Sequence, residues 1–193
     1  LEGWPERVKT MQDNWIGRSE GLESQLDVPE LAEKLPVYTT RPDTAYGITF
    51  VALAAENPIV AKICAGNPKA EAIEAFCAKV RNQSELERTS SESEKEGIFT
   101  GIYAINPFNG KKIPVWISEY VLAGYGTGAI MAVPAHDQRD YDFAKKFGID
   151  IIQVIKGGDI EKEAYTGDGE MINSDFLNGY TNKKDSIKRM LEE

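Results

Sequence analysis

The sequence has few residues of the kinds that hold structural metals. It contains two cysteines, Cys64 and Cys77, and a single histidine, His136. The cysteines do not stand in a CxxC or similar spacing, so we expect buried free thiols and no metal site. Sparing use of cysteine is typical of a reducing compartment, which leads us to expect a cytoplasmic protein.

A long hydrophobic run and an excess of positive charge are also missing. No stretch of about 18 apolar residues is present, so we expect no membrane span. The charged N-terminal stretch is unlike a signal peptide, and its first residue is not methionine, which suggests a fragment of a longer chain. The net charge of −9, from 31 acidic and 22 basic residues, argues against a protein that grips long nucleic acid by its phosphates.

What the sequence does contain is a mixture of helical and strand-like segments. Apolar residues recur at helical spacing in 67–89, and an Asn109-Gly110 pair between two apolar runs predicts a β-hairpin. We expect helices over 6–16, 67–89, 136–148 and 182–193, and a further helix that begins at 58. We expect strands over 36–40, 45–55, 99–105, 111–118 and 149–158. Two more strands should bracket a Gly-rich loop in 119–134.

Strands outnumber helices in this pattern, and several are joined as hairpins. We therefore expect an α+β fold with a closed or nearly closed β-barrel core and peripheral helices. A length of 193 residues suits one well-cored domain. We accordingly expect a single domain over 1–193, with a linker segment at 1–21 and a C-terminal helix at 182–193.

The stretch "VYTTRPDTAYGITF" (37–50) places Thr39, Thr40 and Thr44 around Arg41 and Asp43. Threonine hydroxyls donate and accept hydrogen bonds, and the arginine fork suits a phosphate or a carboxylate. This composition fits a binding pocket. It equally fits a turn in which the aspartate caps backbone N–H groups and the threonines belong to a strand.

A second cluster, "YGTGAIMAVPAHDQRDY" (125–141), carries Asp137 and Asp140 at the opening of a predicted helix. Both carboxylates then lie on one side of the first turn, where they could anchor an ammonium group. The alternative is an N-cap and a first-turn acid that favour the helix dipole. His136 is a candidate general base, or a residue that caps or packs the helix start.

The two clusters together resemble the editing (connective peptide) domain inserted into bacterial-type leucyl-tRNA synthetase. The resemblance is carried by "TTRPDT" (39–44) and "GYGTGAIMAVPAHDQRDYDFAKKFG" (124–148), and extends to "NPFNGKKIPVWIS" and "AYTGDGEMINSDFLNG". The related valine and isoleucine synthetases have a similar threonine-rich loop but a different Asp-containing segment. The aminoacylation signatures of the family are missing, so we expect no amino-acid activation by this chain.

This resemblance implies proofreading: hydrolysis of the ester bond of leucine tRNA mischarged with norvaline, isoleucine or a similar residue, while leucyl-tRNA is spared. It implies a class I parent enzyme that ligates leucine to tRNA with ATP and magnesium, whereas editing needs no cofactor. The implied partners are the 3′-aminoacyl-adenosine end of leucine tRNA and the remainder of the synthetase, to which 182–193 leads back. We expect the fragment to be monomeric.

The resemblance also implies roles for individual residues. Asp140 binds the α-ammonium of the wrong aminoacyl group, and Thr44 blocks the leucine side chain. Thr39 and Thr40, counted with Asp140 as catalytic, surround the ester and the terminal ribose. The remaining substrate-binding residues are Arg41 and Tyr125 near the 3′-terminal backbone, Met131 and Val133 in the pocket wall, and His136 and Asp137.

Two other functions remain open from the sequence. A valine- or isoleucine-type editing domain would share the threonine-rich loop. A non-catalytic module that binds the 3′ end of tRNA would share the pocket without hydrolysing the ester.

Overall fold

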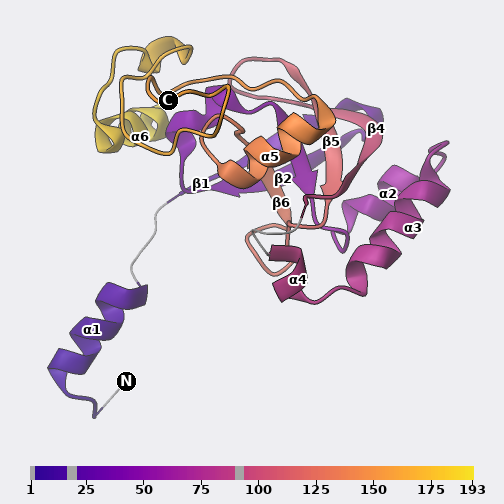
Figure 1. Ribbon diagram of the computed structural model, residues 1–193, viewed down its shortest axis with the longest axis horizontal. Helices are drawn as coiled ribbons and strands as arrows, with labels where there is room; N and C mark the ends of the chain where they lie inside the picture. Colours follow the sequence, from indigo (N-terminus) through magenta and orange to yellow (C-terminus); the bar gives the residue numbers. More distant parts are fainter. Residues whose placement is uncertain (1–2, 17–20, 90–93) are drawn as a thin grey trace.

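The computed structural model describes residues 3–16, 21–89 and 94–193. Helices and strands alternate irregularly along the chain (Figure 1). The strands are β1 (Leu22–Val28), β2 (Glu33–Thr39), β3 (Phe50–Leu53), β4 (Gly97–Ile105), β5 (Lys112–Ser118) and β6 (Ala129–Ala132). The α-helices are α1 (Glu6–Ile16), α2 (Ile59–Cys64), α3 (Ala70–Arg81), α4 (Glu85–Thr89), α5 (Gln138–Phe147) and α6 (Lys183–Glu192), and 3-10 turns occupy Pro29–Leu31, Pro42–Gly47 and Asp175–Leu177.

The six strands form one mixed sheet in the order β2-β1-β4-β5-β3-β6. Only the β3–β5 pair is parallel, and the other neighbours are antiparallel. The hairpin predicted at Asn109-Gly110 is confirmed: β4 and β5 pair on either side of it, and Gly110 has a φ of 68°. A left-handed conformation of this kind favours glycine.

The prediction of a closed or nearly closed β-barrel is wrong, because the sheet is open. In the described part of the chain, β2 and β6 form its two edges and share no ladder hydrogen bonds. Closure would require these edges to pair in register. β6 has only four residues, and the chain leaves β2 for a 3-10 turn at Pro42–Gly47, which ends the extended backbone there.

Three predicted strands are also shorter than expected or missing. The run 45–55 contributes only β3, and 119–123 is not a strand. In 149–158 the described backbone forms a single bridge, between Ile155 and Met171. The amides of Val154 and Ile155 instead donate to the imidazole Nε2 of His136, each at 3.1 Å. A side chain therefore satisfies donors that an extended neighbour would otherwise take.

Helices lie in each of the predicted segments, but 67–89 forms two helices, α3 and α4, instead of one. Local caps explain where α5 begins and ends. Asp137 is the N-cap of α5, and Gly148 ends the same helix with a φ of 66°. Such a residue at C′ accommodates the left-handed turn. On α3, the predicted apolar face is buried at Ile73, Cys77 and Val80. The polar connection predicted after this region lies partly outside the described residues, at 90–93.

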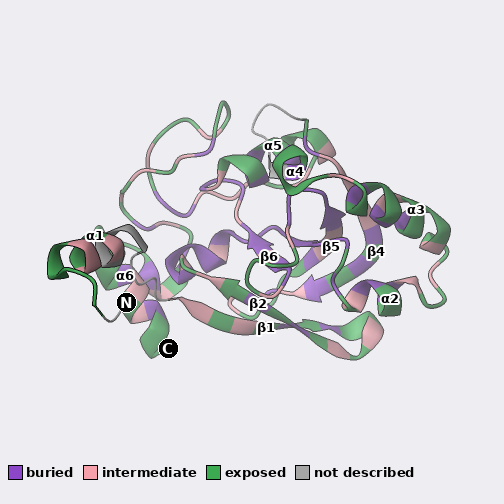
Figure 2. Ribbon diagram, turned by 90° about the horizontal axis from the view of Figure 1, so that it is seen from below, coloured by how far each residue is buried: buried purple, intermediate pink, exposed green. Residues whose placement is uncertain are grey.

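The apolar core lies between the sheet and the elements that cover it (Figure 2). α5 packs on the sheet through Phe143, whose ring stacks on Phe50 at a centroid distance of 5.1 Å and meets Tyr120 edge-on at 5.8 Å. This packing fixes α5 relative to the strands, and its N-terminus carries the second motif. None of the helices in the described ranges is long and apolar enough to cross a bilayer.

Candidate functional site

A hollow of about 470 Å³ lies between the end of β2, β6 and the start of α5. Its volume falls within the usual range for small-molecule sites, about 300–1,000 Å³. It brings together residues from both sequence motifs, although they are far apart in the chain. Of the predicted site residues, those that line it are Thr39, Thr40, Tyr125, Met131, Asp137 and Asp140; it is completed by Tyr38, Tyr120, Val121, Leu122, Gly126, Ala129, Ile130 and Arg139.

Asp140 is the most deeply placed charged group of this hollow. Its side chain is buried, with 4% of the residue exposed. Tyr120 donates its hydroxyl to Oδ1 at 2.8 Å, and the backbone amide of Val133 donates to Oδ2 at 2.9 Å. Each carboxylate oxygen keeps a lone pair, so the group can still accept hydrogen bonds from a ligand.

Burial raises the pKa of the Asp140 carboxyl to about 7, and the nearby Asp137 carboxylate adds to the rise. The hydrogen bonds from Tyr120 and Val133 and the charge of Arg139 act in the opposite direction. A buried acid that titrates near neutrality beside a cavity is typical of a functional site. Burial and this carboxylate also raise the pKa of the Tyr120 phenol, which keeps that hydroxyl a donor.

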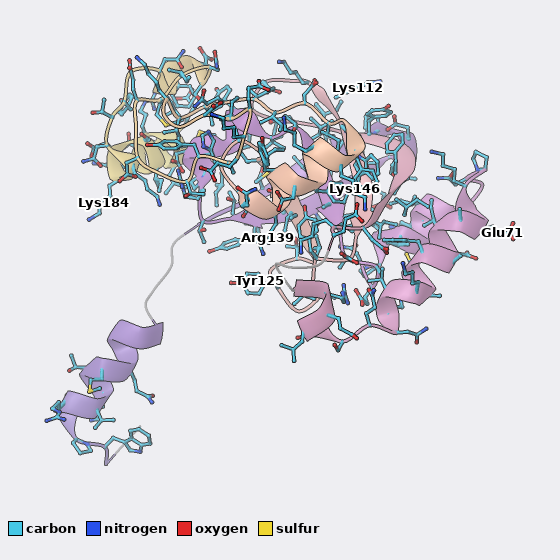
Figure 3. All side chains as sticks on the ribbon, in the orientation of Figure 1. Glu71, Lys112, Tyr125, Arg139, Lys146 and Lys184 are labelled. Carbon is cyan, nitrogen blue, oxygen red and sulfur yellow. The ribbon has the colours of Figure 1, made fainter. Side chains whose placement is uncertain are left out.

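Asp137 performs the capping role that the sequence left open. Its Oδ1 accepts from the backbone amides of Arg139 at 2.9 Å and Asp140 at 3.3 Å. Its Oδ2 pairs with the guanidinium of Arg139 at 3.1 Å. Figure 3 shows Arg139 and the largely exposed Tyr125 on the same side of the molecule, where both line the hollow.

The threonine-rich loop is bound mainly to itself. Arg41 grips the buried Asp43 carboxylate with two hydrogen bonds, at 3.0 and 2.8 Å. The backbone amide of Arg41 donates to Thr39 Oγ1, and its carbonyl accepts from Thr44 Oγ1, each at 3.0 Å. Asp43 therefore holds the arginine rather than capping backbone amides. The bond from the Arg41 amide fixes Thr39 at the hollow, which Thr40 also lines.

Four predicted site residues do not line the hollow: Arg41, Thr44, Val133 and His136. Val133 still takes part through its amide. Thr44 is buried, with 3% exposed. The His136 ring donates from Nδ1 to the carbonyl of Tyr165 at 2.7 Å and accepts two amides at Nε2. Both ring nitrogens are occupied, and burial lowers the pKa of this imidazole, so the neutral ring links the start of α5 to the later chain.

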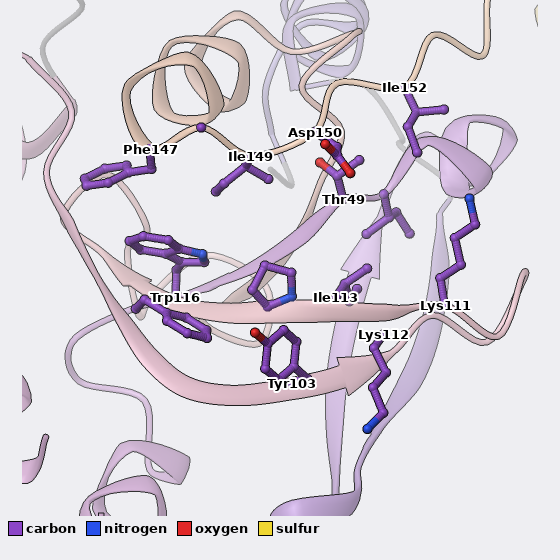
Figure 4. A pocket seen from close by; sticks show the side chains of 14 residues that line it. Thr49, Tyr103, Lys111, Lys112, Ile113, Trp116, Phe147, Ile149, Asp150 and Ile152 are labelled. Atoms are coloured by element: carbon purple, nitrogen blue, oxygen red, sulfur yellow. The ribbon is translucent and has the colours of Figure 1, made fainter. Parts of the chain in front are cut away.

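A second hollow, of about 380 Å³, lies near the other end of α5 (Figure 4). Aromatic side chains including Trp116 and Tyr103 line it, with Lys111 and Lys112 at one end. It contains none of the predicted site residues. Within the described residues, no group of three or more His, Cys, Asp or Glu side chains is placed to hold a metal ion.

Eight lining residues of the first hollow were not predicted from the sequence, and three of them carry polar side-chain groups: Tyr38, Tyr120 and Arg139. Tyr38 and Arg139 adjoin the predicted residues of the two motifs, so a wider reading of each motif would have included them. Tyr120 gives no local signal, because its partner Asp140 is 20 positions further along the chain.

Comparison with known proteins identifies the family. The profile of the family described as leucyl-tRNA synthetase, editing domain, matches residues 13–192. A crystal structure of an Agrobacterium radiobacter K84 leucyl-tRNA synthetase (agnB2), in a ternary complex with tRNA and LeuAMS, is similar with a TM-score of 0.67 and 37% identity. The match covers 84% of this chain and 20% of the synthetase, so the chain spans about a fifth of that protein. The resemblance found in the sequence is confirmed: this chain belongs to the leucyl-tRNA synthetase editing-domain family.

Proposed function

We propose that this chain hydrolyses the ester bond of mischarged leucine tRNA. The observation that carries the proposal is the placement of Asp140 in one hollow with Thr39 and Thr40. Membership of the editing-domain family supports a role in tRNA editing, and the similar synthetase was crystallised with tRNA. The 3′-aminoacyl-adenosine end of the tRNA is the substrate that these groups would meet.

Asp140 is the proposed anchor of the substrate's α-ammonium group. A carboxylate binds an ammonium through charge-assisted hydrogen bonds, which are about twice as strong as neutral ones. The low-dielectric setting of Asp140, with 4% of the residue exposed, strengthens this attraction further. Binding the cation also favours the charged form of a carboxyl whose pKa is about 7 in the free protein.

Thr39 and Thr40 are the proposed neighbours of the scissile ester. Thr39 Oγ1 accepts the amide of Arg41 at 3.0 Å, which leaves its own hydrogen free to donate. Hydroxyls that are already oriented can hold a water beside an ester and stabilise the developing oxyanion without reorganisation. The ester is an activated bond, so we propose hydrolysis by a positioned water with no covalent intermediate and no cofactor.

The substrates that we propose are leucine tRNAs carrying norvaline, isoleucine or a similar residue. A preference for one methylene arrangement is worth only about 1–3 kcal/mol. Steric exclusion of leucine from the editing pocket adds discrimination that the aminoacylation site lacks, as in double-sieve proofreading. ATP and magnesium would serve the aminoacylation reaction of the longer parent enzyme. We propose that this chain and the parent enzyme are cytoplasmic.

The test is deacylation of isoleucyl-tRNA by the Asp140→Ala variant. Loss of a buried, hydrogen-bonded charge partner costs about 2–5 kcal/mol, so we expect kcat/KM to fall at least about 30-fold. Asp142→Ala is the matched control, because Asp142 is an exposed aspartate on the same helix whose Oδ1 accepts only from Gln138 among the described residues. Unchanged activity of Asp140→Ala would refute the assignment.

Binding assays on the same proteins separate hydrolysis from simple recognition. Wild-type protein that binds an aminoacyl-adenosine analogue without any ester turnover would favour a non-catalytic module for the 3′ end of tRNA. A valine-type editing domain would instead hydrolyse valine tRNA mischarged with threonine faster than leucine tRNA mischarged with isoleucine.

A further inference from the structure

We propose that Tyr120 is the positioning residue of Asp140: its hydroxyl orients the carboxylate towards the hollow and keeps it available as an anion for the substrate amine. This inference rests on the proposed editing function. Tyr120 belongs to neither sequence motif; it lies two residues after β5, and its hydroxyl meets Asp140 of α5 in the folded chain.

The carboxylate is held from two sides by donors of different segments. The hydroxyl of Tyr120 donates a hydrogen bond to Oδ1 at 2.8 Å, and the amide of Val133, just after β6, donates one to Oδ2 at 2.9 Å. One donor on each oxygen fixes the plane of the carboxyl group. The free lone pairs are then directed consistently, and a charge-assisted bond to an ammonium depends on that direction.

Tyr120 itself has little freedom to move. It is 4% exposed, and its ring packs edge-on against Phe143. Its backbone is clamped by Arg88 of α4, which donates to the carbonyls of Glu119 and Val121, the two residues flanking the tyrosine, at 2.7 Å each. A planar guanidinium suits such a two-point contact.

The Arg88 clamp is itself buried and paired. The residue is 5% exposed, and its Nη1 lies 2.8 Å from Oε1 of Glu56. Burial without this partner would be costly, so the ion pair holds the guanidinium at the two carbonyls. Helix α4 thus fixes the segment that carries Tyr120, although α4 contributes no residue to the hollow.

The charged and polar groups that face Asp140 act on it in both directions. From α5, the Asp137 carboxylate raises the carboxyl pKa and the Arg139 guanidinium lowers it; from the other segments, the Tyr120 hydroxyl and the Val133 amide lower it. Burial is the largest influence and raises it. Tyr120 therefore opposes the protonation that burial favours, and its hydroxyl can be deleted without changing the other groups.

The variant is Tyr120→Phe, and Tyr141→Phe is its matched control. Tyr141 is also buried, next to Asp140 in sequence, and its hydroxyl has no hydrogen-bond partner among the described residues. Both variants keep the ring that packs in the core, and thermal unfolding will show that both are folded. The readout is the Asp140 carboxyl ¹³C shift in aspartate-labelled protein between pH 5 and 9, with the signal assigned by its loss in Asp140→Asn.

We expect the Asp140 titration midpoint to rise by about one pH unit or more in Tyr120→Phe, as the loss of a hydrogen bond to a charged group implies. It should stay within the error of wild type in Tyr141→Phe. An unchanged midpoint in Tyr120→Phe, or an equal rise in both variants, would overturn the inference.

Deacylation of isoleucyl-tRNA supplies the second readout. At pH 7 we expect kcat/KM of Tyr120→Phe to fall about fivefold, with recovery towards wild type at pH 8.5, since a one-unit rise leaves roughly a tenth of the carboxyl charged. A loss that is equal at every pH would contradict the inference. A wild-type protein without deacylase activity would refute the proposed function instead, and the titration alone would still decide whether Tyr120 controls the carboxylate.

Discussion

At the scale of single residues, the site depends on an acid kept in an unfavourable environment. Asp140 has 4% of its surface exposed and a pKa of about 7. Transfer of a carboxylate from water into such a setting costs free energy unless it is paired. Tyr120 and Val133 offset part of this cost. In the proposed function, the α-ammonium of the substrate would offset the remaining cost.

The first prediction concerns the stability cost of this acid. A carboxyl pKa that is raised on folding adds stability at low pH, and this contribution is lost as pH rises through about 7. The Asp140→Asn variant lacks this dependence. We therefore expect its free energy of unfolding to improve relative to wild type by about 2–4 kcal/mol between pH 4 and pH 8. Urea unfolding across this range measures the difference, and a pH-independent difference would show that the acid is not perturbed.

The second prediction concerns Thr44, the residue expected to exclude leucine. In the structure it is buried outside the hollow, and its hydroxyl donates to the Arg41 carbonyl at 3.0 Å. If its methyl group supports the wall that leucine meets, Thr44→Ala will deacylate leucyl-tRNA, which the wild type spares. Thr44→Val keeps the bulk and loses the hydroxyl, so it should still spare leucine. If Thr44→Ala still leaves leucyl-tRNA intact, Thr44 does not exclude leucine from the pocket.

At the scale of elements, α5 links the sheet to both motifs. Asp137 caps its first turn, and Gly148 ends it. Phe143 anchors its middle on the sheet, where ring contacts with Phe50 and Tyr120 hold the helix close to β3 and to the segment after β5. The position of Asp140 in the hollow therefore depends on packing several residues away from the chemistry.

The third prediction tests this dependence at Gly97, the first residue of β4. A Cβ there would lie 2.5 Å from the Phe143 ring, closer than van der Waals contact allows. We expect Gly97→Ala to lower the free energy of unfolding by about 1–3 kcal/mol, as overpacking of a core does. Gly124→Ala is the control, because a Cβ at Gly124 meets nothing within 4 Å. Equal stability of the two variants would show that α5 shifts without cost.

At the scale of the whole molecule, the net charge bears on how tightly the chain can bind a tRNA. The chain carries a net charge of −9 and spans about a fifth of the similar synthetase. Tight binding of nucleic acid comes largely from cations placed on phosphates. We therefore expect a domain with this acidic balance to make few phosphate contacts of its own.

The fourth prediction follows from this balance. We expect the isolated chain to bind leucine tRNA at least about tenfold more weakly than the full synthetase, with a shallower dependence of log Kd on log salt. Titrations at several salt concentrations, with both proteins against the same tRNA, measure both quantities. Affinity equal to that of the full synthetase would contradict the prediction.

Much of the local structure was predictable because its causes are local. A capping aspartate before α5, a glycine after it and an Asn-Gly pair between apolar runs act over a few residues. The strand expected at 149–158 failed for the opposite reason. The amides of Val154 and Ile155 donate to His136, and no pattern within the segment reveals a partner elsewhere in the chain.

The sequence by itself determined which side chains the two motifs carry, where α5 begins and ends, and the family to which the chain belongs. Only the tertiary structure decided that the sheet stays open, that Thr40 and Asp140 share a hollow while Thr44 and His136 lie outside it, and that Tyr120 completes the site. The physical reason is the separation in sequence between the residues that interact. Caps and turns depend on neighbours in sequence, whereas strand pairing, burial and the raised pKa of Asp140 depend on groups that meet only when the chain is packed.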